Sequence, residues 1–506
     1  MSSSTRNRSQ SETTSATKTI SERDIEAARS TIEQNEDKPQ TDPNLVTWNG
    51  PHDSENPKNW PSKTKWCYTV TVSLFTFISP VSSSMVAPAL KALGKDLHMH
   101  SEIEIELSMS IFILAYAIGP LFFGPVSELY GRVPLLQLSN LWYFAWNLGC
   151  GFARNPAELF VFRFLAGIGG SAPLALGGGA LSDVWKPEER GRAMGIYTLA
   201  PIFGPAVGPI AGGFIAECTT WRWVFWASSI AAVIIQAVGL IGLRESHPGT
   251  ILRKRRDRLV KQTGNAKLHT GGKMESLSGK LRGALIRPLR MLTTQPIIAV
   301  VALYMGYLFG TMYLMLATFP TMWAENYGES SGIGGLNYIS IAIGSVLGIF
   351  VNFKFIDRIY VRLKAKNGGV GQPEFRTPTM VIGAFMVTTG FFWYGWSVQG
   401  HVHWIMPDIG IAIFSAGAMG CLQGMQTYVV DSYTTYAASA MAACALLRSL
   451  AGFAFPLFAP YMYQRLGYGW GASVLAFISI GFGLPAPFIF WKFGPKLRAM
   501  SKFASG

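Results

Sequence analysis

The chain has 506 residues, of which 49% are hydrophobic and only 14% charged. Soluble proteins usually carry about 25% charged residues, so this composition excludes an ordinary soluble protein and predicts several membrane-spanning helices. The formal net charge of +14 would favour nucleic-acid binding in a soluble chain, but basic cytosolic loops account for it in a membrane protein.

The N-terminal segment, residues 1–45, is rich in Ser, Thr, Glu, Arg and Lys and has no apolar core. We expect a disordered cytosolic tail that is not a signal peptide, so that the first membrane helix directs insertion. Residues 46–65 carry Trp48 and Trp60 together with prolines and lysines. This composition predicts an interfacial collar on the membrane surface.

Apolar stretches of about 20 residues predict twelve membrane-spanning helices. Six are expected near residues 66–88, 105–126, 134–152, 159–181, 192–215 and 223–243. Six more are expected near residues 297–320, 333–356, 377–397, 404–430, 437–461 and 470–492. The predicted fold class is an all-α integral membrane protein with two six-helix bundles, residues 66–243 and 297–492. A linker, residues 244–296, joins them, and a tail, residues 493–506, follows.

The Lys and Arg residues of the predicted loops set the orientation in the membrane. Loops on the side of the N-terminus hold 22 of them and the opposite loops hold 5. Because cytosolic loops carry the excess, both termini are expected in the cytosol. Thirteen of the 22 lie between Arg244 and Arg290, and they predict a solvated linker that anionic lipid attracts, in preference to nucleic acid.

The stretch from Ala200 to Phe214 combines an apolar composition with three prolines and four glycines. Its glycines at positions four apart form one smooth stripe on a helix, against which another helix can pack closely. Its prolines bend the helix, because each removes a backbone donor. The spacing alone leaves open whether this is a packing helix or a functional one. The residues concerned are Gly204, Pro205, Gly208, Pro209, Gly212 and Gly213.

Three motifs occur in the first predicted bundle. A loop motif runs from Gly124 through Glu128 and Gly131 to Arg132, the helix-4 segment Arg163–Gly169 follows, and the glycine–proline stretch lies in helix 5. Together they resemble the motifs of the major facilitator superfamily, with Glu128 where an aspartate is commoner. Residues 183–192, 221–226 and 428–440 resemble its fungal drug:proton antiporters with twelve helices. The resemblance covers about residues 46–496.

This resemblance implies a role for Arg163 in proton coupling, beside the proton path, where its charge lowers the proton affinity of a neighbouring acid. A guanidinium in the middle of a span costs at least about 2.5–3.5 kcal/mol, so it needs a partner. The alternative is an arginine that only hydrogen-bonds to helix carbonyls. The resemblance also implies that the glycine stripe of helix 5 presses against the other half, at helix 8.

Acids in mid-membrane are missing from helices 1 and 2, so the sequence does not name the group that carries the proton. The acids considered lie near helix ends: Glu128, Asp183, Glu217, Asp357, Asp408 and Asp431. Asp183 lies about 30 Å along a helix from Arg163 and cannot pair with it. We expect Asp183 to meet Arg132 and Glu128 as a cytosolic latch; an ordinary helix-end ion pair is the alternative.

Two further charge pairs are expected. One joins Glu217 to Arg222 on the outer side, and the other joins Asp431 to Arg448 or to lipid headgroups. For the substrate, aromatic and amide side chains suggest a cavity for amphipathic or aromatic compounds, with plain packing as the alternative. They are Phe112, Tyr116, Tyr304, Tyr307, Gln423 and Gln426.

The resulting hypothesis is a monomeric, proton-coupled exporter of hydrophobic drugs, toxins or secondary metabolites in the plasma membrane. A uniporter or symporter for nutrients or organic acids is the alternative, and the helix-5 motif favours antiport. The five cysteines form no CxxC pair, the seven histidines form no metal pattern, and no phosphate-binding loop occurs. We therefore expect no metal, no cofactor, no use of ATP and no enzymatic activity.

Overall fold

The computed structural model describes residues 42–271, 277–499 and 501. The chain divides into two units, a small one of Met1–Thr47 with Arg256–Gly271 and a large one of Trp48–Arg255 with Gly272–Gly506. In the small unit, strand β1 (Leu45–Val46) pairs in parallel with β2 (His269–Thr270). The predicted tail therefore lies almost entirely outside the described residues, and its last residue begins a strand.

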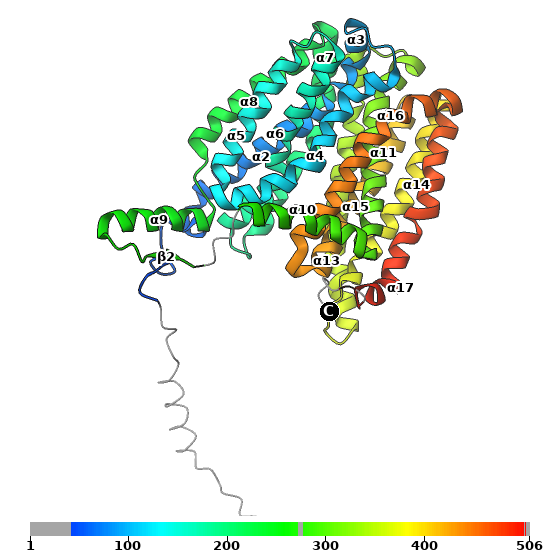
Figure 1. The fold of residues 1–506 in the computed structure, drawn as a ribbon. Coiled ribbons are helices and arrows are strands. Elements are labelled where there is room, and N and C mark those ends of the chain that lie inside the picture. Colours follow the sequence, from blue (N-terminus) through cyan, green and yellow to red (C-terminus); the bar gives the residue numbers. More distant parts are fainter. Residues whose placement is uncertain (1–41, 272–276, 500, 502–506) are drawn as a thin grey trace, which may run out of the picture. The chain divides into compact units, whose positions relative to one another are not determined.

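The first half of the large unit holds the helices drawn in blue to green in Figure 1. Their bounds are α2 (Ser62–Ser84), η2 (Ala87–Ala89), α3 (Leu90–Asp96), α4 (Glu102–Tyr130), α5 (Arg132–Cys150), α6 (Pro156–Val184), α7 (Arg190–Cys218) and α8 (Arg222–Gly242). A short η1 (Pro57–Asn59) precedes them.

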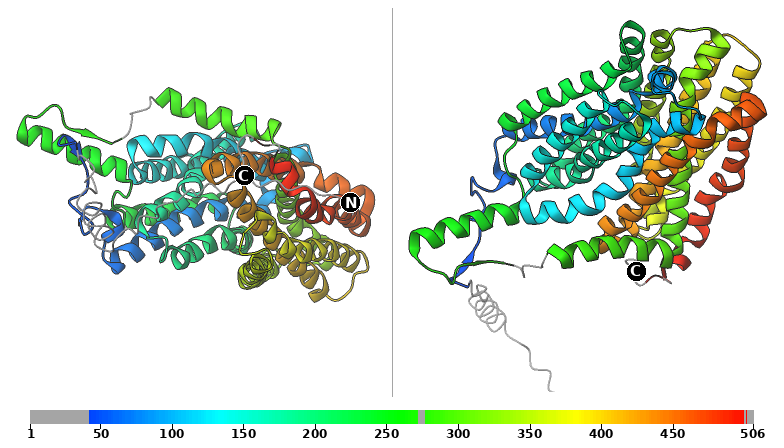
Figure 2. Two further views of the ribbon diagram at one scale, coloured as in Figure 1. Left: turned by 90° about the horizontal axis from the view of Figure 1, so that it is seen from below. Right: turned by 45° about the horizontal axis from the view of Figure 1, so that its top comes forward.

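The second half follows two linker helices, α9 (Pro248–Thr263) and α10 (Leu277–Thr294). It contains α11 (Pro296–Tyr327), α12 (Ser331–Leu336), α13 (Tyr338–Lys366), η3 (Pro373–Arg376), α14 (Pro378–Gln399), α15 (Ile405–Ser432), η4 (Thr434–Tyr436), α16 (Ala437–Ile478), η5 (Ser479–Gly483) and α17 (Pro485–Ala499). Both views in Figure 2 show the yellow-to-red helices of this half grouped beside the blue-to-teal helices of the first.

All twelve predicted spans fall on helical segments among the described residues, so the all-α membrane fold is confirmed. Ten helical segments meet the combined criteria of length and hydropathy for a membrane span. One of them, Ala437–Ala499, holds the last two predicted spans. Gly467, whose φ is +72°, interrupts the helix between these two spans. The helices extend past the predicted bounds by several residues, since polar ends continue the helix beyond its apolar run.

Helix α5 is absent from those ten because it carries a polar face, and its partner explains that face. The side-chain amide of Asn140 donates to Gln236 of α8 at 2.8 Å, and that of Asn147 donates to Ser228 and Ser229 at 2.9 and 2.8 Å. Both asparagines are buried. Their hydrogen bonds are satisfied inside the bundle, as a lipid environment requires.

The first membrane helix is broken, which the apolar composition did not predict. Helix α2 ends at Ser84, and the chain continues through η2 into α3. Proline at position 88 cannot donate to the carbonyl of Ser84, and Pro80 lies one turn earlier inside α2. Carbonyl groups near the break therefore lack helical partners and need others.

Helix α7 packs its glycine stripe against this break. A Cβ on Gly208 or Gly212 would come closer than 3.0 Å to backbone atoms of Val81 or Met85, and one on Gly204 would meet Pro80 in the same way. The prediction that this stripe faces helix 8 is therefore wrong: it faces α2 in its own half. Small residues mark a close approach but do not say which helix approaches.

Contact with the other half falls instead to neighbouring residues of α7. A Cβ on Gly213 would meet the backbone of Ser331, at the start of α12, and a Cβ on Gly335 of α12 would lie 3.0 Å from the Pro209 carbonyl oxygen. Helix α12 lies directly before α13, the eighth membrane helix, and both contact α7. The outer end of α7 is thus placed between its own half and the second half.

The linker is more structured than a solvated segment. Arg253 donates to the carbonyl of Leu129 at the end of α4, and Arg255 forms an ion pair of 2.7 Å with the buried Asp53 of the collar. Hydrogen bonds from the Asn49 amide and Arg255 lower the pKa of Asp53 to about 2. Farther along, α10 contacts both α4 and α16, and Figure 1 shows it lying across the ends of the bundle helices.

We predict that Gly208→Leu lowers the thermal stability of the purified protein. The larger side chain has to displace the α2 backbone, and overpacking of this kind costs about 1–3 kcal/mol. The matched control is Gly195→Leu on the same helix, where a Cβ meets nothing within 4 Å. Equal melting temperatures for the two variants in detergent would contradict the packing of this stripe on α2.

Candidate functional site

Arg163 lies in the outer third of α6 and is fully buried. It lies seven residues from the start of that helix, about 10 Å along its axis. The expected position was the middle of the span. Its guanidinium donates to the carbonyls of Ser82 and Ser83 at 3.2 and 3.4 Å. These are two carbonyls at the broken end of α2, so Arg163 caps the break.

The same guanidinium also reaches α4. It donates to the carbonyls of Ser108 and Met109 at 3.0 and 3.5 Å, and it stacks 4.5 Å from the ring centre of Phe112. In the described part of the chain, all its hydrogen-bond partners are backbone carbonyls, and none is a carboxylate. In this state the residue thus ties helix 1 to helix 2, which is the alternative role considered above.

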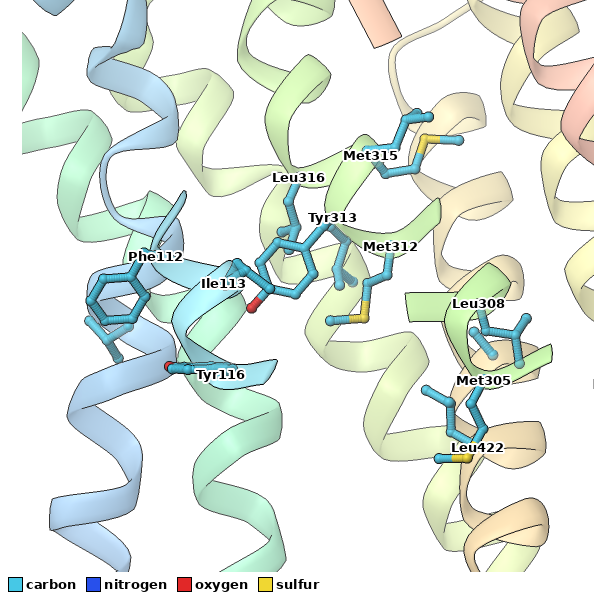
Figure 3. Close-up of a cluster of buried hydrophobic side chains, with 14 of the residues drawn as sticks. Phe112, Ile113, Tyr116, Met305, Leu308, Met312, Tyr313, Met315, Leu316 and Leu422 are labelled. Carbon is cyan, nitrogen blue, oxygen red and sulfur yellow. The ribbon is translucent and has the colours of Figure 1, made fainter. Parts of the chain in front are cut away.

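Near this arginine the second half contacts α4 through α16 and reaches α2 through Tyr313 of α11. Figure 3 shows Ile113 and Tyr116 of α4 beside Tyr313 of α11. The hydroxyl of Tyr313 lies 3.2 Å from Ser83 Oγ, and that of Tyr116 lies 2.5 Å from Ser79 Oγ. The second half thus contacts α2 at Ser83, one residue before the end of that helix.

The six residues predicted to line a substrate cavity lie in both halves. Phe112 and Tyr116 are buried against α2 and α6 in the first half. Tyr307 donates to the carbonyl of Leu475 at 2.7 Å and stacks on Tyr304, so both rings pack inside the second half. Gln423 and Gln426 are half-buried on α15. Their contact with cargo stays a prediction.

The cytosolic charge cluster of the first half centres on Arg132. Its guanidinium forms an ion pair of 3.1 Å with Asp183, at the end of α6, and donates to Ser127 at 2.6 Å. Glu245 completes the cluster, because its carboxylate accepts from the backbone amides of Arg132 and His247 at 3.0 and 2.9 Å. Sequence reasoning missed Glu245, since a carboxylate bound to backbone amides leaves no spacing pattern.

One group of the predicted latch lies differently. Glu128 is exposed, and its backbone carbonyl accepts from Arg253 at 3.4 Å. Beside the cluster, burial and then the charge of Arg132 lower the pKa of His247. The role of the cluster as a latch stays a prediction, while its ion pair is part of the structure.

A second charge cluster occupies the corresponding place in the second half. Arg376, just before α14, binds Asp357 of α13 at 2.7 Å and Asp431 of α15 at 3.1 Å. Asp431 is therefore a partner of Arg376, and the predicted pair with Arg448 is wrong. Arg448 lies over the Phe309 ring at 4.8 Å. Sequence reasoning did not single out Arg376.

The outer face also differs from the predicted pairing. Arg222 binds Asp96 at 2.6 Å, not Glu217. Glu217 accepts instead from the amide of Gly332 at 2.7 Å and from Ser330 at 3.0 Å. A carboxylate at the N-terminus of α12 is favourable, because the free amides there point at it. This contact joins the first half to the second.

A cavity of about 360 Å³ lies at the same outer face, between the halves. Its walls come from η2, α3, α4 and α7 of the first half and from α11, α12 and α16 of the second. The buried Glu106 of α4 belongs to its lining. Sequence reasoning missed this acid because it belongs to a run of three, Glu102, Glu104 and Glu106, which is typical of the solvated start of a helix. Among the described residues, no group of His, Cys, Asp and Glu suits a metal ion.

We predict that Gly131→Ala destabilises the protein, whereas Gly124→Ala is tolerated. Gly131 has a φ of +103°, and a Cβ there would come closer than 3.0 Å to the Glu245 carboxylate, whereas a Cβ on Gly124 meets nothing within 4 Å. A strained residue of this kind costs about 1–3 kcal/mol. Melting temperatures of the two purified variants test this, and an unchanged Gly131→Ala would contradict the role given to Glu245.

The chain was compared with known families and proteins. A model of the Major Facilitator Superfamily matches residues 72–456. "Efflux pump vrtL" of Penicillium aethiopicum is 66% identical over 465 residues, covering 92% of each chain. "Efflux pump radE" of Floropilus chiversii is 39% identical over 483 residues, covering 95% of this chain and 89% of that protein.

Solved structures agree on the fold. The inward open conformation of the xylose transporter XylE from E. coli aligns with a TM-score of 0.64 at 15% identity, covering 85% of this chain and 96% of that one. At this identity the likeness shows the fold alone. The family model and the relatives together establish that the chain belongs to the major facilitator superfamily, in the branch that contains fungal efflux pumps.

Proposed function

We propose that this chain is a proton-driven exporter of hydrophobic or amphipathic small molecules, such as drugs, toxins or a fungal secondary metabolite. The observation that carries the proposal is the 66% identity to a protein named an efflux pump, across 92% of both chains. The proposed location is the plasma membrane, and the proposed working form is a monomer without a cofactor.

The motif of α7 supports the direction of transport. It resembles the signature of proton-driven antiporters, and its glycines lie against the break in the first helix. A gradient of about 100 mV supplies roughly 2.3 kcal/mol per proton, which sustains an approximately fifty-fold difference in cargo concentration. This energy is sufficient for export without ATP.

The contacts of Arg163 suggest how it supports coupling. Its guanidinium holds carbonyls of α2 and α4 together, so any movement of helix 1 against helix 2 has to break or exchange these hydrogen bonds. We infer that Arg163 is a positioning residue, which fixes the relation of the two helices in each state. The clusters around Arg132 and Arg376 are proposed to do the same at the cytosolic ends.

A proton symporter or uniporter for nutrients is the second candidate. Its support is the fold shared with a structure titled "Crystal structure of D-xylose-proton symporter", at 16% identity and a TM-score of 0.63. At that identity the likeness supports the fold but not the function. The sequence identity to the efflux relatives is two to four times higher. We therefore favour export.

We predict that Arg163→Ala abolishes gradient-driven efflux from fungal cells that express the protein. The substitution leaves buried carbonyls without donors, and each unsatisfied carbonyl costs about 1–3 kcal/mol. We expect the rate of efflux to fall at least about tenfold, since 1.36 kcal/mol on a barrier is a factor of about ten. Export of a panel of dyes and toxins is measured for the wild type, Arg163→Ala and the exposed Arg154→Ala as a control.

Two outcomes would contradict the proposal. Efflux by the wild type that persists after a protonophore collapses the gradient would exclude proton coupling. Efflux by Arg163→Ala at the wild-type rate would show that its hydrogen bonds to α2 and α4 do not matter for transport. Uptake in place of efflux would favour the nutrient transporter.

A further inference from the structure

The outer cavity contains a buried acid without a partner. Glu106 is 6% exposed, and among the described residues its Oε2 atom has no hydrogen-bond partner. Both neighbouring acids are different: Glu102 is exposed, and Glu104 accepts from the backbone amide of His100 at 3.1 Å. Glu106 is thus the one of these three acids that is buried in the seam between the halves.

Burial of this group has a defined electrostatic consequence. An ionised carboxylate without a cation or donor costs several kcal/mol away from water, whereas a neutral carboxyl does not carry that cost. When the outer face is closed, a proton on Glu106 removes the penalty. When that face opens, water reaches the cavity and the ionised form becomes acceptable.

The charged and titratable groups that line the cavity do not compensate the negative charge of an ionised Glu106. Lys91 of α3 is the cation among them, and it is paired with Glu325 of α11 at 2.6 Å across the two halves. Glu102 lies one turn from Glu106 on the same face of α4, and its negative charge repels an ionised Glu106. The remaining titratable groups are the phenols of Tyr463 and Tyr468 on α16, with Tyr338 of α13 nearby.

The position of Glu106 also brings it close to the level of Arg163. Arg163 donates to the carbonyls of Ser108 and Met109, two and three residues along α4. This separation is about 3–5 Å along the helix axis. One turn deeper than Glu106, the buried Ser110 hydroxyl also has no partner. Polar groups thus lead from the cavity toward the joint between α2, α4 and α6.

We propose that Glu106 is the carboxyl group that takes up the proton from the outer side during export. The proposal rests on the proposed function, namely proton-driven efflux. In the open state, a proton from external water binds a carboxylate oxygen of Glu106 as the cargo leaves. Closure of the halves then buries the neutral acid. Because the outer face stays closed while the transporter opens to the cytosol, the proton leaves Glu106 inward, past the Ser110 hydroxyl and toward the joint between α2, α4 and α6.

The first experiment does not depend on the cargo. The carboxyl band of the purified, reconstituted protein is followed by infrared spectroscopy during a pH titration, for the wild type and Glu106→Gln. We expect a protonated carboxyl signal near neutral pH that Glu106→Gln lacks. Asp408→Asn is the control, because Asp408 is also buried with an unpartnered oxygen but does not line the cavity. A signal unchanged in Glu106→Gln, or lost in Asp408→Asn alone, would overturn the proposal.

The second experiment uses transport in proteoliposomes with an imposed pH gradient. The probe is a fluorescent dye that the wild type exports, with rhodamine 6G as the first choice. Glu106→Gln is expected to reduce the accumulation from as much as about fifty-fold to none, while dye still exchanges down its own gradient. The exposed Glu188→Gln, outside the cavity, should behave as the wild type.

The results separate the two proposals. If dye movement by the wild type ignores the pH gradient, the proposed proton-driven export fails. If the wild type responds to the gradient and Glu106→Gln responds equally, the export proposal holds and the assignment of Glu106 fails.

Discussion

The break in the first membrane helix is the feature on which the surrounding structure depends. Within a bilayer no water reaches the carbonyl groups that such a break exposes, and each unsatisfied group costs several kcal/mol. Arg163 supplies donors to Ser82 and Ser83 from one side. From the other side, α7 comes into direct contact with the backbone at Met85, because it presents Gly212 there. Two motifs that look separate in the sequence thus serve one joint.

The contacts between the two halves are unevenly distributed between the membrane faces. At the outer face, among the described residues, Lys91 pairs with Glu325, and Glu217 binds the start of α12. The charge clusters at the other face, around Arg132 and Arg376, each lie within one half. There α10 contacts both halves. This distribution describes a state in which direct polar bonds hold the outer face together.

Helix positions could be predicted from the sequence because a span of about 20 apolar residues has few other structural solutions. The pair of Arg132 and Asp183 could also be expected, since both lie at helix ends on one membrane face. The partner of the α7 stripe could not, because a row of small residues marks close approach without naming the other helix. Glu245 depends on hydrogen bonds to backbone amides, which leave little trace in side-chain patterns. The break after Ser84 does have a trace, Pro80 and Pro88, but prolines alone do not say where a membrane helix ends.

Glu106 was the least predictable group, and the reason bears on its role. It belongs to a run of three acids, and only the tertiary fold distinguishes them, by placing the second half over one side of α4. Acids such as Asp183 and Asp431 have partners within their own half, so rocking of the halves leaves those pairs intact. The exposure of Glu106 depends on the distance between the halves. A group that links proton binding to the opening of the transporter has to have that dependence, because the ionised and neutral forms then favour different states.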